Sequence, residues 1–540
     1  MRLTDEELKN REQWEKAGIE LPRFDREKMK QATKEKPEWV HFGAGNIFRI
    51  FPLALEQTLL ERGIEKTGII MVAGRDGGVI NEVFKPCDNL TLGVTLKADG
   101  GIVKKVIASA ACSLWMGNKA DFETLKGVFR SPSLRMASLT ITEKGYNLFD
   151  SQGALIPDAA EDCLNGPAGT DGAGPGNYIA KITALLYERY LASPLPLALV
   201  SMDNCSHNGD KLLGAVETFA IKWAQGGKAE KGFAGYIRDR SLVSFPWTMI
   251  DKITPGPDQG VKAVLEQSGF TDTKIYAKTT PTAPFVNAEE PQYMVIEDSF
   301  PAGRPRLEET GVLFTSRDVV DKVEKMKVCT CLNPLHTALA IFGCLLGYTR
   351  ISEEMKNPDL VKLVEGIGYN EGLPAVTDPG ILSPQEFIRE VIKVRFPNPF
   401  MPDTPQRIAS DSSQKIPVRY GETIKAYLTK PGLDIHSLKL IPLVLAGWLR
   451  YLLGVNDEGK PFTVSPDPRL ADLQPRLAGI KPGSSGPFHQ ALEPILADKT
   501  IFAVNLWEAG IGEKVESLFG ELLAGPGAVA KTLGKYVNEG

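Results

Sequence analysis

Residues 38–51 read EWVHFGAGNIFRIF, and this stretch decides the fold. The apolar run 39–42 predicts a short strand, Gly43 and Gly45 predict a tight turn, and the residues through ALEQTLLERG predict a helix. This arrangement suits a pyrophosphate, because glycines let the backbone approach closely and free N–H groups meet negative charge. Phe48 stands where a third glycine is usual, so the motif alone is also compatible with a plain strand–turn–helix corner.

The alternation of strand and helix continues along the first half of the chain. Strand-like runs recur at 68–77, 138–146 and 197–205, with helical runs between them such as 178–192. Such alternation predicts a doubly wound parallel sheet of the Rossmann-like kind and favours the dinucleotide interpretation of the turn. The expected cofactor contacts in the turn are Gly43, Ala44, Gly45, Asn46, Ile47 and Phe48.

Helical periodicity replaces the strand signal after about residue 310. We therefore predict two domains in this chain, an α/β domain followed by a mostly α-helical domain. Residues 1–285 form the NAD-binding domain, which carries a charged N-terminal extension, and residues 286–540 form the mainly helical substrate and catalytic domain.

The end of the second predicted strand bears on the choice of cofactor. Asp76 could accept hydrogen bonds from a ribose diol, which favours NAD, whereas Arg75 could meet a 2′-phosphate, which favours NADP. The alternative is that both residues simply cap a loop. We expect NAD, with NADP left open.

Composition and charge narrow the class of protein. A 540-residue chain with 43% hydrophobic and 24% charged residues is typical of a multi-domain globular protein. The net charge of −5 offers no basic stripe, so we expect no nucleic acid or membrane partner. The charged N-terminus resembles no signal peptide, and apolar runs such as 336–348 stop short of a membrane span. Seven cysteines without framework spacing indicate reduced thiols, so we expect a cytoplasmic enzyme.

Three polar clusters are candidates for substrate contacts. In SMDNCSHNG (201–209), Asn204 and Asn208 are neutral donors that could hold a developing alkoxide, although these residue types also favour turns. Asp251 lies in the apolar run 245–255, as part of a structural pair with Lys252 or as an orienting group. The segment 407–422 holds Arg407, Lys415 and Arg419, cations that suit a polyhydroxylated or carboxylated ligand unless the segment is an ordinary solvated loop.

Residues 327–336 read KVCTCLNPLH and raise the choice between a metal site, a redox pair and a proton-transfer site. Cys329 and Cys331 are one residue apart, which fits neither zinc ligand pairs nor the Cys-x-x-Cys of oxidoreductases. Small structural cysteines are the better interpretation. The cluster then leaves Lys327, Asn333 and His336, and a lysine in an apolar pocket can shuttle a proton near neutrality.

Six motifs in order resemble the mannitol dehydrogenase family of long-chain polyol dehydrogenases. They are HFGAGNIFR, LTITEKGY, SMDNCSHNG, FPWTMIDKITP, the segment from EDSFPAG to NPLH, and RIASDSSQK, and together they span roughly residues 39–420. The resemblance implies a nicotinamide cofactor, no metal and a lysine acid/base. The implied roles are proton transfer for Lys327, oxyanion stabilisation for Asn204 with Asn333, substrate hydroxyl binding for His336, grip on the far end of the sugar for Arg407 and Lys415, cofactor contact for Glu143, and supporting or gating roles for Asp251 and Glu324.

One spacing departs from the family pattern. The family has Lys-x4-Asn-x2-His, whereas this chain has five residues between Lys327 and Asn333. At about 100° per residue, the nine positions from Lys327 to His336 place the two on opposite faces of a regular helix. We therefore predict a break within 325–345: either a π-bulge, or a new helix capped by Asn333 with Pro334 at its first position.

The resemblance implies hydride transfer between NAD(H) and the keto carbon of an open-chain sugar acid or ketose. Overall similarity and the nearby cations favour the branch that reduces D-fructuronate to D-mannonate, with tagaturonate reductase and mannitol 2-dehydrogenase as alternatives. A hypothesis from another class is a dinucleotide-binding sensor without catalysis. We expect a small-molecule sugar acid or polyol as partner, and a monomer or small homo-oligomer.

Overall fold

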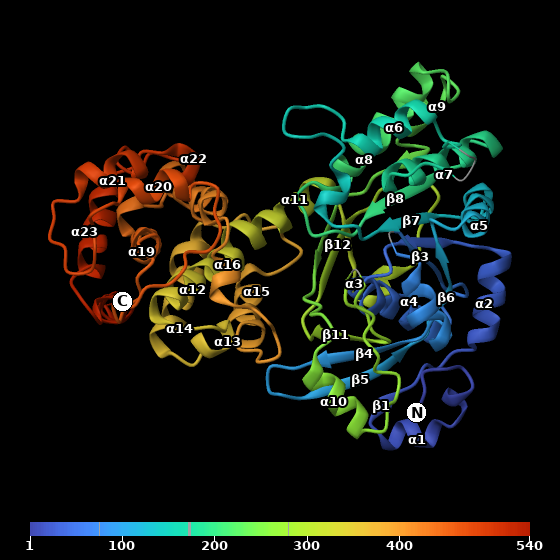
Figure 1. Cartoon of the computed structure of the whole chain (residues 1–540), viewed down its shortest axis with the longest axis horizontal. Helices are drawn as coiled ribbons and strands as arrows, with labels where there is room; N and C mark the ends of the chain where they lie inside the picture. The colour runs from blue at the N-terminus through green and yellow to red at the C-terminus, as the bar shows by residue number, and fades with distance from the viewer. Residues whose placement is uncertain (75, 171–173, 279, 540) are drawn as a thin grey trace. The chain divides into compact units, whose positions relative to one another are not determined.

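A computed structural model of the chain describes residues 1–74, 76–170, 174–278 and 280–539. Two compact units are present: Met1–Lys97 with Gly101–Asp321, and Ala98–Gly100 with the chain from Lys322 onward (Figure 1). This division falls later than 285/286, where the sequence placed the boundary. The reason is that β12 (Tyr293–Glu297) pairs with β10 (Thr248–Asp251) and β13 (Leu313–Thr315), which keeps this part of the chain in the first unit.

The first unit is built on a six-stranded, all-parallel sheet, which confirms the predicted doubly wound fold. The strand order is β6-β3-β2-β7-β8-β9, so the order reverses between β2 and β7. Open α/β sheets bind ligands at such a switch point, outside the carboxyl ends of the strands. The strands are β2 (Trp39–Phe42), β3 (Ile69–Ala73), β6 (Ala110–Trp115), β7 (Met136–Leu139), β8 (Leu197–Ser201) and β9 (Val243–Ser244).

Alternating side chains of this sheet fill two separate cores. Val40 and Phe42 of β2 pack on one face, and Trp39 packs on the other. Because successive strand residues point to opposite faces, a strand covered on both sides needs apolar residues throughout. The first face is covered by α5 (Lys119–Arg130), α7 (Tyr178–Ala192), α8 (Asn208–Gln225) and α9 (Phe233–Arg238), and the second by α3 (Asn46–Ile50) and α4 (Pro52–Glu61).

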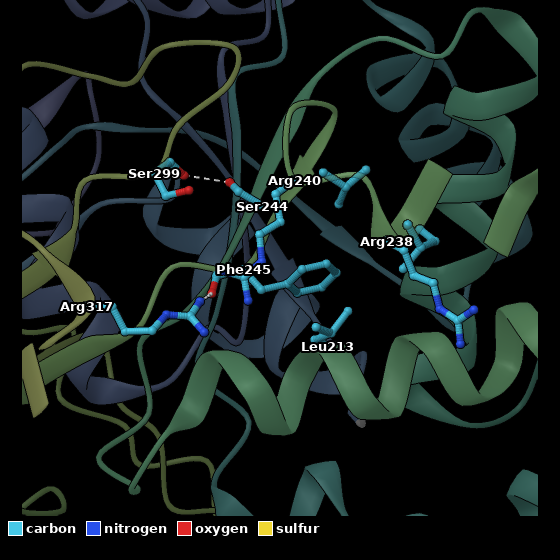
Figure 2. A pocket seen from close by; sticks show the side chains of 9 residues that line it. Leu213, Arg238, Arg240, Ser244, Phe245, Ser299 and Arg317 are labelled. Atoms are coloured by element: carbon cyan, nitrogen blue, oxygen red, sulfur yellow. Dashed lines mark hydrogen bonds between the residues drawn. The ribbon is translucent and has the colours of Figure 1, made fainter. Parts of the chain in front are cut away.

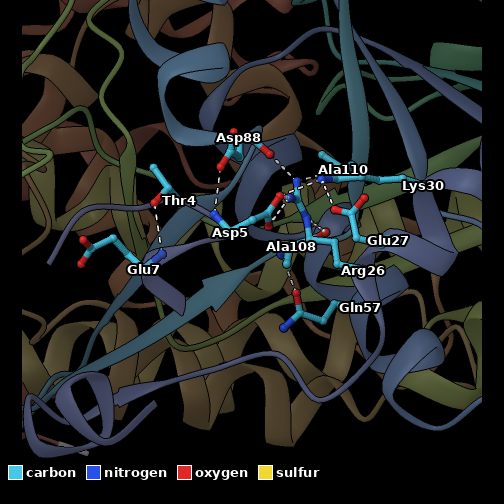
Figure 3. A network of polar contacts seen from close by, with 10 residues as sticks. All are labelled: Thr4, Asp5, Glu7, Arg26, Glu27, Lys30, Gln57, Asp88, Ala108 and Ala110. Carbon is cyan, nitrogen blue, oxygen red and sulfur yellow. Dashed lines mark hydrogen bonds and ion pairs between the residues drawn. The ribbon is translucent and has the colours of Figure 1, made fainter. Parts of the chain in front are cut away.

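The N-terminal extension folds onto this unit as α1 (Arg11–Lys16), β1 (Ile19–Glu20) and α2 (Arg26–Glu35). The buried Arg26 donates through Nε to the carbonyl of Ala108 at 3.0 Å and forms an ion pair with Asp5 (Figure 3). Lys30 binds the same carboxylate at 2.7 Å, and the Asp5 N–H donates to Asp88 Oδ2 at 2.9 Å. The extension is therefore an integral part of the fold.

Smaller elements complete the first unit. A four-stranded sheet has the order β1-β5-β4-β11, and a three-stranded sheet has the order β10-β12-β13. The remaining elements are β4 (Thr91–Leu96), β5 (Ile102–Ile107), β11 (Phe285–Glu289), α6 (Pro157–Asn165) and α10 (Gln259–Gln267).

The second unit is helical, as predicted. Its most buried helices are α12 and α19. The helices are α12 (Asn333–Leu346), α13 (Ile351–Glu354), α14 (Pro358–Glu365), α15 (Pro384–Glu390), α16 (Pro405–Ile408), α17 (Ser412–Ile416), α18 (Glu422–Thr429), α19 (Leu440–Tyr451), α20 (Leu470–Arg476), α21 (His489–Leu496), α22 (Lys499–Phe502), α23 (Gly512–Leu522) and α24 (Ala528–Asn538), and α11 (Arg317–Met326) crosses from the first unit into the second.

One helical stretch in the described part of the chain, Arg317–Leu346, is long and apolar enough to cross a membrane by length and composition. It exceeds the short apolar run expected from the sequence, because α11 and α12 join through a further helical turn at 327–331. Its most apolar window is 72% buried inside the structure, as in the core helix of a folded domain.

Candidate active site

The Gly-x-Gly turn lies at the switch point of the parallel sheet. Gly43 follows β2 with φ +123°, and a Cβ there would stand 2.2 Å from the carbonyl oxygen of Thr140, so only glycine fits. Gly45 is exposed, and a Cβ on it would meet no atom of the described residues within 4 Å. The turn therefore presents its backbone to open space, as close approach of a pyrophosphate requires.

Phe48 occupies the position of the missing third glycine. Its ring is fully buried and stacks on His41, with ring centroids 3.7 Å apart and planes at 2°. The ring nitrogens of His41 lie 2.7 Å from Ser138 Oγ and 2.9 Å from Thr140 Oγ1, and burial holds the pKa of His41 well below 6.5. The aromatic stack thus packs the helix against β2.

Arg49 braces the same turn from inside the unit. Its buried guanidinium donates through Nη1 to the carbonyl of Ala283 at 2.7 Å and through Nη2 to Asn46 Oδ1 at 2.9 Å. Burial lowers its pKa to about 9. Asn46, an expected cofactor contact, is therefore held by Arg49, a residue that the sequence pattern alone does not mark as functional.

The residues expected at the adenosine ribose follow β3. Arg75 lies outside the described residues. Asp76 accepts the Gly78 N–H through Oδ1 at 2.8 Å and the Tyr276 hydroxyl through Oδ2 at 2.8 Å. Tyr276 was not singled out in the sequence, because 200 residues separate it from Asp76.

The loop after β7 carries Glu143 and is clamped by Asp203. The Asp203 carboxylate accepts the N–H groups of Ile141 and Thr142, each at 2.9 Å, and the Tyr146 hydroxyl at 2.6 Å. Thr142 has φ +69°, which strains a β-branched residue. Glu143 is exposed and forms an ion pair with Lys211. Asp203 thus fixes the approach to Glu143 at the carboxyl edge of the sheet.

The two asparagines after β8 have different environments. Asn204 is exposed, whereas Asn208 is fully buried. The Asn208 amide donates to the carbonyl of Asp203 at 2.9 Å and to Thr248 Oγ1 at 2.8 Å, and it accepts the Thr248 N–H at 3.0 Å. A side chain without exposed surface does not fit the expected substrate contact, so Asn208 is a structural link to β10. Asp251, at the end of β10, is 5% exposed.

The predicted break between Lys327 and His336 is confirmed. Lys327–Cys331 form a π-helical turn in which the Leu332 N–H donates to the carbonyl of Lys327 at 3.1 Å. Leu332 leaves helical geometry at φ −127° and is the N-cap of α12, so Asn333 is the first residue of this helix and not its cap, as one alternative had predicted. Because a π-turn absorbs one residue more than an α-turn, the nine positions act as eight, which corresponds to about 80°. Lys327 is 3% exposed and Asn333 is half-buried.

His336 is a neutral imidazole in a charged setting. Its Nε2 is 3.6 Å from Asp403 Oδ2, beyond hydrogen-bond distance, and its ring packs 5.1 Å from Phe396. Burial lowers the pKa of His336 to about 4, against the opposing effect of Asp403, and the cations Arg419 and Arg407 lower it further. His336 is therefore uncharged near neutral pH.

The cations of segment 407–422 lie on the same unit as His336. Arg407 is exposed and forms an ion pair with Asp403, while Arg419 Nη1 donates to Thr337 Oγ1 on α12 at 2.6 Å. Lys415 Nζ donates to backbone carbonyls, including that of Ile408 at 3.3 Å. Burial lowers the pKa of Lys415, and the positive charge of Arg419 lowers it further.

Matches to sequence profiles cover both units. The profile of the mannitol dehydrogenase Rossmann domain matches residues 37–309, and that of the mannitol dehydrogenase C-terminal domain matches residues 319–516. The chain belongs to the mannitol dehydrogenase family. The resemblance seen in the sequence is thereby confirmed.

Several relatives share nearly the whole length of this family member. D-mannonate oxidoreductase of Thermotoga maritima is 52% identical over 99% of both chains. Mannitol 2-dehydrogenase of Cereibacter sphaeroides is 29% identical over 86% of this chain and 89% of its own.

Two solved structures share the fold. A substrate-free D-sorbitol dehydrogenase has a TM-score of 0.79 at 26% identity, covering 95% of this chain and 97% of its own. The ternary complex of Pseudomonas fluorescens mannitol 2-dehydrogenase with NAD and D-mannitol has a TM-score of 0.70 at 25% identity and covers all of both chains.

Two features of this mannitol dehydrogenase family member are candidates for other kinds of site: a small cavity and the cysteines of residues 327–331. Arg238, Arg240, Arg317 and Phe245 line a cavity of about 20 Å³, shown in Figure 2, which has room for about one water and not for a sugar. Among the described residues, no group of three or more His, Cys, Asp or Glu could hold a metal ion. Burial raises the pKa of Cys331, as expected for a structural thiol.

Proposed function

We propose that this chain is an NAD(H)-dependent oxidoreductase that interconverts D-fructuronate and D-mannonate. The observation that carries the proposal is the 52% identity over 99% of both chains with a D-mannonate oxidoreductase. The Rossmann unit and the helical unit match the two family profiles in the order expected of a sugar or polyol dehydrogenase.

The nucleotide turn fits a nicotinamide dinucleotide. The pyrophosphate would lie against the exposed backbone at Gly45, within the turn Gly43–Phe48, and Asp76 would bind the adenosine ribose. Asp76 favours NAD over NADP, because a carboxylate accepts hydrogen bonds from a ribose diol and repels a 2′-phosphate. When bound, the cofactor supplies or accepts the hydride. Glu143 follows the neighbouring strand β7 and is the further cofactor contact that we propose.

Lys327 is the residue that we assign to proton transfer. Its side chain is almost fully buried at the π-turn, and a lysine amine can act as both general acid and general base. Lys327 gives a proton to the alkoxide that forms on reduction of the ketone and takes it back on oxidation. Asn204 and Asn333 are neutral amide donors for the same oxygen.

His336 has the properties of a substrate-binding group. With a pKa of about 4 it stays neutral, so it can donate and accept hydrogen bonds with sugar hydroxyls without competing with Lys327 as the acid. Arg407, Lys415 and Arg419 supply positive charge for the far end of an acidic sugar. This charge favours a sugar acid over the neutral ketose of a mannitol 2-dehydrogenase, and it does not separate fructuronate from tagaturonate.

The test follows NADH absorbance with the purified protein and D-fructuronate, D-tagaturonate and D-fructose in parallel. We expect oxidation of NADH with D-fructuronate. Turnover with D-tagaturonate alone would identify a tagaturonate reductase, and turnover with D-fructose alone would identify a mannitol 2-dehydrogenase. Binding of NADH without turnover on any of the three would favour the sensor hypothesis. We further propose that the protein acts in the cytoplasm, as a monomer or small homo-oligomer.

A further inference from the structure

Tyr276 makes a specific contact with the residue expected at the cofactor's ribose. Its hydroxyl donates to Asp76 Oδ2 at 2.8 Å, while Asp76 Oδ1 accepts the Gly78 N–H at 2.8 Å. A Cβ on Gly78 would stand 2.3 Å from the Tyr276 hydroxyl and 3.0 Å from Asp76 Oδ1. The chain therefore has a glycine where a side chain would displace the tyrosine.

The segment that carries Tyr276 is tied to the pyrophosphate turn. Tyr276 and Thr282 exchange two backbone hydrogen bonds of 2.8 Å, which close a loop. The carbonyl of the next residue, Ala283, accepts a hydrogen bond from the buried Arg49 guanidinium, which also donates to Asn46 in the turn. One segment thus contacts both the turn after β2 and the loop after β3.

The N-terminal extension holds the preceding residues of this segment. The N-terminal amino group donates to the carbonyl of Gly269 at 2.7 Å, the Thr271 N–H donates to the carbonyl of Met1 at 3.0 Å, and the Leu3 N–H donates to Asp272 Oδ2 at 2.6 Å. These anchoring residues precede residue 37, where the match to the Rossmann-domain profile begins. The support for Tyr276 therefore comes partly from outside the matched domain.

We propose that Tyr276 is a positioning residue that sets the preference for NAD over NADP by holding the Asp76 carboxylate. This inference rests on the proposed function. A carboxylate can accept several hydrogen bonds at once, so the ribose diol would bind in addition to the tyrosine. Fixing the carboxylate in advance strengthens its bonds to the diol and keeps its charge where a 2′-phosphate would lie.

The test compares NADH and NADPH binding to Tyr276→Phe, measured by the fluorescence of the bound dinucleotide. Loss of one hydrogen bond to a charged group should raise the Kd for NADH about tenfold. The Kd for NADPH should stay the same or fall, so the preference for NADH shrinks. The matched control is Tyr536→Phe, which removes a tyrosine hydroxyl bonded to Glu521 at 2.7 Å in the other unit and should leave both Kd values unchanged.

Two further variants separate positioning from a general structural role. Gly78→Ala displaces the hydroxyl without removing it and should lower the NADH preference in the same way, which covers the case of a poorly folded Tyr276→Phe. In an Asp76→Ala background, Tyr276→Phe should change NADH binding by less than about twofold, because its partner is gone.

Three results would overturn the inference: unchanged or tighter NADH binding in Tyr276→Phe, equal weakening of both dinucleotides, or an undiminished effect in the Asp76→Ala background. Failure of the wild-type protein to bind either dinucleotide would instead refute the proposed function.

Discussion

Substitution of the two turn glycines by alanine should separate folding from cofactor binding. Gly43 has φ +123°, and an added Cβ would lie 2.2 Å from the carbonyl oxygen and 2.5 Å from the Oγ1 of Thr140. Gly45 has φ −77°, and its Cβ would meet nothing within 4 Å among the described residues. The same methyl group therefore clashes with the protein at one position and protrudes into open space at the other.

The expected energies differ accordingly. In Gly43→Ala, the unfavourable φ costs about 1–3 kcal/mol, and the clash with the end of β7 costs about 1–3 kcal/mol more. The free energy of unfolding should therefore fall by about 2–6 kcal/mol. In Gly45→Ala the backbone angle is allowed, so the loss should stay below about 1 kcal/mol. The methyl group would nevertheless separate the backbone from the pyrophosphate, and the Kd for NADH should rise roughly tenfold or more.

The assay pairs urea unfolding, followed by circular dichroism, with NADH binding followed by fluorescence. Gly214→Ala in α8 is the matched control, because its added Cβ also meets no atom of the described residues within 4 Å, away from the turn. If Gly45→Ala folds normally and binds NADH as tightly as the wild-type protein, the turn is not the pyrophosphate site. A Gly43→Ala variant as stable as the control would refute the steric argument.

Three other outcomes test individual side chains. Lys327→Ala should reduce turnover at least about 100-fold while leaving the Kd for NADH within about twofold, and retained turnover in steady-state kinetics would refute the assigned role. The pKa of His336 is about 4 in the folded chain and about 6.5 in the unfolded chain, so between these pH values only the unfolded chain binds the proton. The free energy of unfolding should therefore fall by about 3 kcal/mol as the pH drops from 6.5 to 4. Urea titrations at several pH values should show a weaker pH dependence for His336→Asn. Burial raises the pKa of Glu354 well above 4.5, so the free energy of unfolding of the wild-type protein should fall as the pH rises above 4.5. Glu354→Gln should lack that loss, and parallel pH profiles of the two proteins would contradict the interpretation.

The elements that were predictable from the sequence are those set by local pattern. Short apolar runs that end in glycine or polar residues identified β2, β3 and β8, because central parallel strands are buried on both faces. The run predicted at 138–146 was misplaced: it overlaps β7 (Met136–Leu139) only at its first two residues, and the rest is the loop that carries Glu143. A break before α12 was also predictable, from the spacing of Lys327 and His336 and from Pro334. It falls at Leu332, however, and Asn333, the residue that Pro334 was expected to keep out of helical geometry, is the first residue of α12. In both cases the decisive residues are neighbours in the chain.

The unpredicted features depend on contacts between distant residues. Asn208 has the residue type of a substrate ligand, and only its hydrogen bonds to Thr248, 40 positions away, show that its amide is used within the protein. The pKa of His336 depends on burial and on charges from α16 and the turn that follows α17. Residue type and spacing carry no information about such partners.

The replacement of the third glycine by Phe48 shows how the fold compensates for an incomplete motif. That glycine normally allows close packing of the helix on the strand. Here α3 ends after five residues, because Phe51 turns to ψ −75° and Pro52 starts α4. A helix this short need not lie close along β2, so a phenyl ring fits between them and stacks on His41. The stack and the Arg49 guanidinium then hold the turn in place. The two remaining glycines are Gly43, whose positive φ the turn requires, and Gly45, whose open face lets a dinucleotide approach the backbone.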